Sequence, residues 1–118
     1  MITTFEALAE PTRRRILVLL RDQPRLVGDL AQLLGITQPN VSKHLRVLRD
    51  VGLVQVRQDE NEGRRHWYEL RAEPLAEIDD WLQPFRQHMQ ARYDRLESVL
   101  NELEQEENSH DQQDESPR

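Results

Sequence analysis

The 118-residue sequence predicts a mainly α-helical chain with one small β-hairpin, an α+β arrangement. Three observations predict this class. Apolar residues recur at helical spacing through residues 27–50. Two short runs rich in β-branched and aromatic residues, 53–58 and 64–70, then flank a polar loop. Finally, an apolar pattern with a period close to seven residues runs through residues 78–103 and predicts one long closing helix.

Two helices are expected at the start of the chain. Phe5 and Leu8 belong to a short first helix, which Pro11 interrupts before it opens the second. Residues 13–15 are all arginine and stand near the start of the second helix, where the helix dipole disfavours positive charge. They are either a clamp for phosphate groups or a solvated surface run, and the sequence leaves both open. The second helix has a broad apolar face made of Ile16, Leu17, Leu19 and Leu20.

Residues 27–54 have the pattern of a helix-turn-helix. Gly35 follows the first of its helices, where a left-handed residue commonly ends a helix. Thr37 is a suitable N-cap for the next helix, and Pro39 falls in the first turn, where its missing N–H has no cost. We call this second helix of the motif the recognition helix. It has one narrow apolar stripe made of Val41, Leu45 and Leu48.

The opposite side of the recognition helix has donors suited to the phosphates and base edges of double-stranded DNA. The alternative is an αα-hairpin with a solvated face. Two features count against it. Ala31 and Gly35 let two helices cross closely, and Asp50 is the only acid between residues 38 and 51. On this face we expect DNA contacts from Thr37, Gln38, Asn40, Ser42, Lys43 and Arg46, with Arg49 further along.

Residues 53–58 and 64–70 are expected to pair as a two-stranded ribbon directly after the recognition helix, an arrangement known as a wing. Arg64 and Arg65 stand at its tip, where phosphates or a minor groove would lie. The alternative is an ordinary hairpin tip, which the nearby acids Asp59 and Glu60 favour. We expect the two arginines to contact DNA.

A long helix is expected from Pro74 to about residue 104, roughly 45 Å at ~1.5 Å per residue. Pro84 lies inside it and must kink or restart it, which the sequence does not decide. No small domain covers so long an apolar stripe, so a second copy of the chain is expected to cover it. The predicted homodimer interface consists of Phe5, Leu8, Ile78, Leu82, Phe85, Met89, Tyr93, Leu96 and Leu100.

The expected organisation is one winged helix-turn-helix DNA-binding domain, residues 1–104, whose closing helix, residues 74–104, mediates dimerisation. Residues 105–118 are almost all acidic or polar and are expected to form a disordered tail. The net charge of −6 belongs to the end of the chain, because residues 1–70 carry +2 and residues 71–118 carry −8. A mildly basic front can therefore face a polyanion.

Composition excludes several classes of protein. The chain has no Cys, hence neither a disulfide framework nor a thiolate metal site. It has no apolar run near the ~18 residues of a membrane span and no signal-peptide pattern, so we expect a cytoplasmic protein that binds no membrane. It also lacks a Gly-rich phosphate loop and any catalytic grouping of His with carboxylates, so we expect no enzyme.

Residues 4–100 resemble the ArsR/SmtB family of bacterial winged-helix repressors. The resemblance lies in FEALAEPTRRRILVLL, QPNVSKHLRVLRDVGLV and GRRHWYEL. It implies a homodimer, held by the first and last helices, that represses transcription until an inducer releases it. It also implies DNA contacts from Gln38, Ser42, Lys43 and His44, the last in the family's Ser-x-His-Leu pattern.

The chain departs from the metal-sensing members of that family. Leu26, Val27 and Gly28 precede Asp29-Leu30, where those members have a Cys-x-Cys pair. His88 stands alone in the last helix, whereas zinc between last helices needs further histidines. We expect a non-metal-sensing member with no cofactor and an unknown effector. The alternatives are a winged-helix module for protein interaction or dimerisation, and a metal-responsive repressor with a non-thiolate site.

Overall fold

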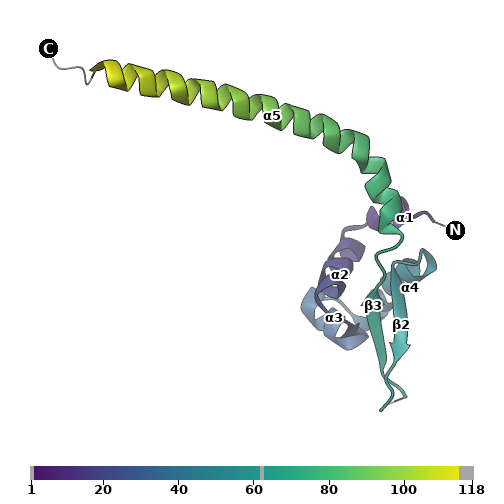
Figure 1. Ribbon diagram of the computed structural model, residues 1–118. Coiled ribbons are helices and arrows are strands. Elements are labelled where there is room, and N and C mark those ends of the chain that lie inside the picture. The colour runs from purple at the N-terminus through teal and green to yellow at the C-terminus, as the bar shows by residue number, and fades with distance from the viewer. Residues whose placement is uncertain (1, 62, 115–118) are drawn as a thin grey trace. The chain divides into compact units, whose positions relative to one another are not determined.

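The computed structural model describes residues 2–61 and 63–114. The chain forms two compact units, Met1–Asp80 and Trp81–Arg118. The mainly helical class with a small antiparallel sheet, which the sequence predicts, is confirmed. The elements are α1 (Thr4–Leu8), α2 (Pro11–Asp22), β1 (Arg25–Leu26), α3 (Val27–Leu34), α4 (Gln38–Asp50), β2 (Val54–Gln58), β3 (His66–Leu70) and α5 (Leu75–Asp114) (Figure 1).

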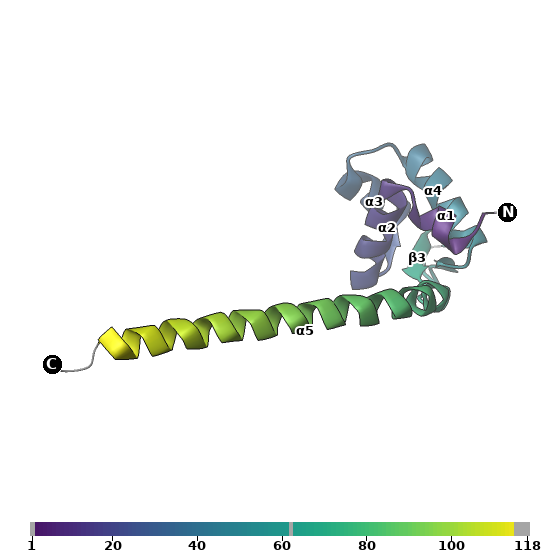
Figure 2. The ribbon, with the colours of Figure 1, turned by 90° about the horizontal axis from the view of Figure 1, so that it is seen from above.

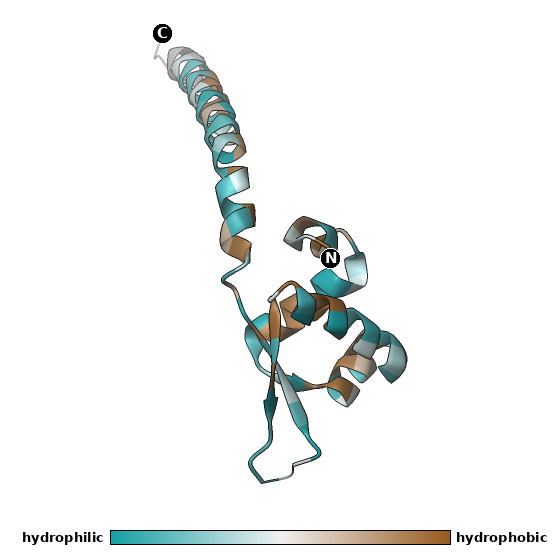
Figure 3. Ribbon diagram, turned by 90° about the vertical axis from the view of Figure 1, so that its right-hand side faces the viewer, coloured by the Kyte–Doolittle hydropathy of each residue, from teal (hydrophilic) through white to brown (hydrophobic). Residues whose placement is uncertain are grey.

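The first unit is built around three helices whose apolar faces meet. α2, α3 and α4 contribute Ile16, Leu30 and Leu45, each no more than 1% exposed. In Figure 3 the hydrophobic colour lies on the inner sides of these helices, while the tip of the hairpin is hydrophilic. The stripe predicted on the recognition helix, which is α4, is buried in this core together with Leu53.

Two of the three clustered arginines bind the end of α1. Arg13 Nε donates to the carbonyl oxygen of Ala7 at 2.6 Å. Arg14 Nη1 donates to the carbonyl oxygens of Leu8 and Ala9 at 2.8 and 3.1 Å. These carbonyls lie at the C-terminal end of α1, where they lack helical partners and where the dipole favours a cation. The pair therefore fastens α1 to α2, a role that neither interpretation of the sequence included.

The turn between α3 and α4 follows the prediction. Gly35 has a φ of 70°, and its N–H donates to the carbonyl oxygen of Ala31 at 2.9 Å. Thr37 caps α4, since its Oγ1 accepts from the backbone N–H of Asn40 at 3.3 Å. Pro39 lies in the first turn, as expected. The direction of the recognition helix is thus set by this turn as well as by the core.

The sheet has three antiparallel strands in the order β1-β3-β2. β2 and β3 form the predicted wing, in which Val54 lies opposite Leu70 and Val56 opposite Tyr68. The sequence did not predict β1, which pairs with β3 and has only two residues, too few to show a period of two. Because β1 lies between α2 and α3, it ties the base of the wing to the helices.

α5 is one helix of 40 residues (Figures 1 and 2). It continues through Pro84, and the boundary between the two units falls within it, after Asp80. The carbonyl of Asp80 loses its usual donor because Pro84 has no N–H. α5 runs ten residues past the expected end at residue 104, since residues 105–114 are polar but contain neither Gly nor Pro. Residues 115–118 of the predicted tail lie outside the described residues. No helix among the described residues is both long and apolar enough to span a bilayer.

The burial of α4 predicts the effect of truncating its central leucine. Leu45→Ala should lower the free energy of unfolding by about 2–5 kcal/mol, because it leaves a cavity in a fully buried site. Urea denaturation followed by circular dichroism measures this loss. Val18→Ala, on the half-exposed side of α2, is the matched control and should change stability by less than ~1 kcal/mol. Similar losses for the two variants would contradict the assigned core.

Candidate nucleic-acid interface

One side of α4 is exposed along its length while the other side is buried. The buried side consists of Val41, Leu45 and Leu48. The exposed side chains are Gln38, Asn40, Ser42, Lys43, Arg46 and Arg49. Because both sets belong to one rigid helix, burial of the first set fixes the direction in which the second set points. These exposed side chains are all hydrogen-bond donors, and Lys43, Arg46 and Arg49 also carry positive charge.

Thr37 and Gln38 lie where the recognition helix begins and have different roles. The Thr37 hydroxyl accepts the capping N–H of Asn40, and its own proton remains available to an acceptor such as a phosphate oxygen. The Gln38 side chain lies beside Gly28 in α3: a Cβ at Gly28 would come 3.4 Å from Gln38 Nε2. The missing side chain of Gly28 therefore leaves space for the Gln38 amide.

His44 differs from the other expected DNA contacts because its ring lies against α2. Its side chain is 14% exposed, and Nδ1 lies 3.8 Å from Glu10 Oε2. Nδ1 is buried and makes no hydrogen bond within the described residues. Glu10 Oε2 also accepts the backbone N–H of Arg13 at 2.9 Å, which caps α2. His44 therefore links the recognition helix to the start of α2, and we leave it out of the proposed DNA contacts.

The Glu10 carboxyl has a shifted pKa. Partial burial raises this pKa, but hydrogen bonds from the backbone N–H groups of Arg13 and Thr12, together with electrostatic interactions with His44 and Arg13, outweigh that effect and lower it. Glu10 is therefore ionised in the folded protein at neutral pH. Glu10 was not among the residues expected from the sequence, although Pro11 marks a helix start and acidic residues are enriched near helix starts.

The tip of the wing is held by contacts that involve the predicted arginines. Arg64 and Arg65 are both exposed, and the Arg65 guanidinium lies 6.0 Å from the centre of the Trp67 ring. Trp67 Nε1 donates to Asp59 Oδ2 at 3.2 Å, and the Asp59 N–H donates to the carbonyl of Arg65 at 2.9 Å. Asp59, which counted against DNA contact in the sequence, is thus engaged in folding the tip.

Comparison with known proteins shows the family. Residues 10–56 match the family model described as "Bacterial regulatory protein, arsR family". The transcriptional repressor SdpR of Bacillus subtilis is 33% identical over 85 residues, which make up 72% of this chain and 91% of SdpR. This chain belongs to the ArsR family. It is a DNA-binding transcriptional regulator.

Two further matches cover a smaller share of both chains than the match with SdpR does. The regulator CmtR of Mycobacterium tuberculosis is 50% identical over 70 residues, which cover 59% of this chain and 57% of CmtR. The solved homodimeric winged helix-turn-helix DNA-binding domain Mb0332 of Mycobacterium bovis has a TM-score of 0.54 and 32% identity, over 70% of this chain and 73% of that one. The chain thus spans little more than half the length of some curated relatives.

The side chains predicted for the dimer interface of this ArsR-family chain fall in both units. Leu8 is half-buried against the core, and Phe5 is 37% exposed. Ile78 and Leu82 at the start of α5 are half-buried. The others lie on the second unit and are about half exposed: Phe85, Met89, Tyr93, Leu96 and Leu100.

The predicted interface omitted two apolar residues of α5. Trp81 and Val99 are 56% and 50% exposed, and the Trp81 ring lies 4.8 Å from that of Phe85. Trp81 is next to Leu82, and Val99 is next to Leu100. The spacing of three and four residues that starts at Ile78 selected the two leucines instead.

His88, the lone histidine considered as a metal ligand, is exposed on α5. The described residues hold no group of three or more side chains that could bind a metal ion. That the chain lacks a metal site stays a prediction.

The lowered pKa of Glu10 predicts a pH-dependent contribution to stability. A carboxylate with a depressed folded-state pKa stabilises fully above its ordinary pKa, and the contribution is lost as the pH falls through the folded value. Glu10→Gln should therefore be less stable than the parent at neutral pH, and the difference should shrink on acidification.

Urea unfolding of both proteins between about pH 7 and pH 3 measures this difference. Glu60→Gln, an exposed carboxylate in the wing, is the control, and its difference from the parent should be small at every pH. A Glu10→Gln difference that stays constant with pH would show that the carboxylate charge contributes nothing.

Proposed function

We propose that this chain is a sequence-specific transcriptional repressor that binds an inverted-repeat operator as a homodimer. The main support for the proposal is the exposed face of α4, which consists of hydrogen-bond donors. The buried stripe on the opposite side of the helix fixes the direction in which this face points. A rigid helix of this width suits the major groove, where each base pair shows a distinct pattern of donors and acceptors. The proposed DNA contacts are Thr37, Gln38, Asn40, Ser42, Lys43, Arg46, Arg64 and Arg65.

The exposed apolar stripe of α5 supports the homodimer. Its eight large side chains are 48–58% exposed, more than a soluble helix carries on one face without a partner. The relative Mb0332 is a homodimer. The interface would combine Phe5 and Leu8 of α1 with the α5 stripe. A two-fold axis would then place two recognition helices ~34–36 Å apart, in successive major grooves of an inverted repeat.

The remaining expectations extend this proposal. Residues 1–104 act as the DNA-binding and dimerisation domain, and the acidic residues 105–118, the first ten of which continue α5, repel DNA. A regulator of this kind acts on the bacterial chromosome, so we place it in the cytoplasm. Its proposed function requires neither a cofactor nor an enzymatic activity.

Selection of binding sites from random duplexes tests the function. The purified protein should enrich an inverted repeat whose half-sites lie about 10–10.5 base pairs apart. Its affinity for the selected duplex should exceed that for a scrambled one by about 10³-fold or more, and both affinities should fall steeply with salt. Equal affinity for the selected and scrambled duplexes would sink the proposal.

The two DNA-facing elements should differ in what they read. Gln38→Ala and Lys43→Ala should each cost about 1–3 kcal/mol on the selected operator and relax base preference there, because their donors face base edges. Arg64→Ala should weaken all sequences about equally and make the salt dependence shallower by about one unit, because it faces phosphate. Titrations of operator and scrambled duplexes at several salt concentrations measure both effects.

Val18→Ala, at a half-exposed position of α2 outside the proposed contacts, is the control for these titrations and should leave both affinities unchanged. The division of roles would be reversed if Arg64→Ala changed base preference while Gln38→Ala and Lys43→Ala weakened every duplex alike.

A further inference from the structure

His44 lies on the buried side of α4 although it is a polar residue. It is three residues after Val41 and four before Leu48, so these three side chains share one face of the helix. The His44 side chain is 14% exposed, and its Nδ1 atom is buried without a hydrogen-bond partner among the described residues. Burial of a polar atom without a partner costs free energy, and an apolar side chain at this position would avoid that cost.

Glu10 is the single ion-pair partner of His44 in the part of the chain that the structure describes. Its Oε2 atom lies 3.8 Å from His44 Nδ1, which is close enough for an ion pair but too far for a hydrogen bond. The same oxygen accepts the backbone N–H of Arg13 at 2.9 Å. One carboxylate oxygen therefore both caps α2 and faces the recognition helix.

Other charged groups around this pair are directed elsewhere or are absent. The Arg13 guanidinium, which also interacts with Glu10, donates to the carbonyl oxygens of Ala7 and Glu6 in α1. On α4 itself, the residues one turn away from His44 are all uncharged: Asn40, Val41, Val47 and Leu48. A positive charge on the His44 ring would therefore have the Glu10 carboxylate as its counter-charge.

An ion pair at this position would restrain the rotation of α4 about its axis. Burial of the apolar stripe is non-directional, so it tolerates small rotations that keep these side chains out of water. An ion pair depends instead on the distance between two particular atoms. Lys43 adjoins His44 in the chain, so a rotation that separates His44 from Glu10 also displaces the Lys43 amine, which we propose contacts DNA.

We propose that His44 is a positioning residue for operator recognition, which holds the recognition helix in a fixed direction relative to α2 through the Glu10 carboxylate. In this role His44 touches no DNA and acts through the donors on the opposite side of α4. The inference rests on the sequence-specific DNA binding proposed above, and it assigns part of that specificity to a contact within the fold.

The restraint should depend on pH because histidine changes its charge between about pH 5 and 8. Glu10 stays ionised throughout this range, since its pKa is lowered from the ordinary value of a carboxyl group. A protonated imidazole attracts the carboxylate, whereas a neutral one does not. The restraint is therefore present at lower pH and is lost as the pH rises and the His44 ring loses its charge.

The ratio of the affinities for the selected operator and for a scrambled duplex measures this restraint, because added positive charge by itself strengthens both complexes. In the parent protein the ratio should rise about threefold between about pH 8 and pH 6. In His44→Gln and in Glu10→Gln it should not rise, because each variant lacks one charge of the pair. A parent ratio that stays constant over this range would overturn the inference.

Urea unfolding at both pH values establishes that the variants remain folded during these titrations. Glu10→Gln keeps a side-chain oxygen that can accept the N–H of Arg13, so the cap of α2 is retained while the charge is removed. A change in the pH profile of a folded variant therefore reports the charge of the pair and not a loss of structure.

The double variant His44→Gln with Glu10→Gln tests whether the two residues act as a pair. At about pH 6 each single variant should lower the affinity ratio about threefold, and the double variant should lower it no further. Losses that multiply in the double variant would contradict the inference, because they would show that His44 and Glu10 act separately.

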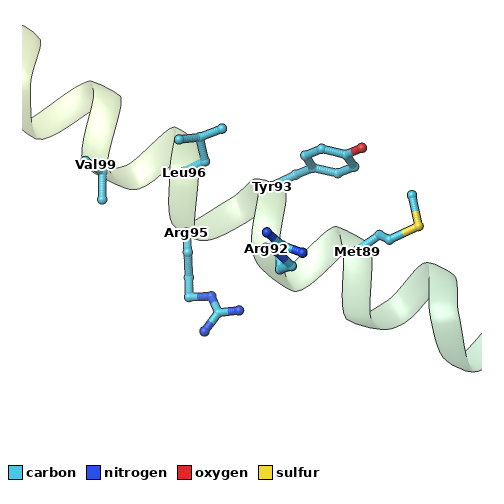
Figure 4. Close-up of a pocket in the computed structure, with 6 residues that line it drawn as sticks. All are labelled: Met89, Arg92, Tyr93, Arg95, Leu96 and Val99. Atoms are coloured by element: carbon cyan, nitrogen blue, oxygen red, sulfur yellow. The ribbon is translucent and has the colours of Figure 1, made fainter.

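His88→Gln is the control for the pH profile. His88 is exposed on α5 and is not among the residues that line the concavity of this helix, from Met89 to Val99, shown in Figure 4. The substitution therefore leaves the apolar side chains there unchanged, and the affinity ratio should depend on pH as it does in the parent. A flat profile in His88→Gln would assign the pH dependence to the wrong histidine.

The outcomes separate this inference from the proposed function. A parent protein without preference for any selected duplex at either pH loses the proposed function, and the role of His44 with it. A parent protein that prefers its operator, and whose preference is unchanged in His44→Gln and Glu10→Gln, keeps the function and loses only the role of His44.

Discussion

The exposed polar side of α4, which we propose contacts DNA, depends on the burial of one narrow stripe on the same helix. Val41, Leu45 and Leu48 are at most 1% exposed, and burial of each stabilises the fold by roughly 1.5–3 kcal/mol. Rotation of the helix about its axis would bring these side chains into water. The polar side of α4 therefore has one direction relative to α2 and α3, and a docked helix can read base edges only if that direction is fixed.

Charged residues near this surface have several different roles. Arg13 and Arg14 bind carbonyl oxygens at the end of α1, although their sequence would equally suit a phosphate clamp. Asp59 folds the tip of the wing through Trp67. His44 lies against Glu10. Fixed partners of this kind hold these side chains within the fold, whereas the exposed cations that we propose as DNA contacts lie on α4 and at the wing tip.

Charge is distributed unevenly along the chain. Residues 1–70 carry a slight positive excess and include the recognition helix and the wing, whereas residues 97–109 of α5 contain only acidic charges. Acidic charge repels DNA phosphates, which favours approach by residues 1–70. α5 also carries exposed apolar side chains together with these charges.

The sequence by itself determined the order of the elements, the helix-turn-helix, the wing and the apolar stripe of α5. Those features follow from local signals: the left-handed Gly35, the Thr37 cap and regular apolar spacing. Tertiary structure alone decided the pairing of β1 with β3 and the inward turn of His44 towards Glu10. Both join segments distant in the chain, and a two-residue strand or a single histidine has no periodic pattern, so only the folded core brings the partners together.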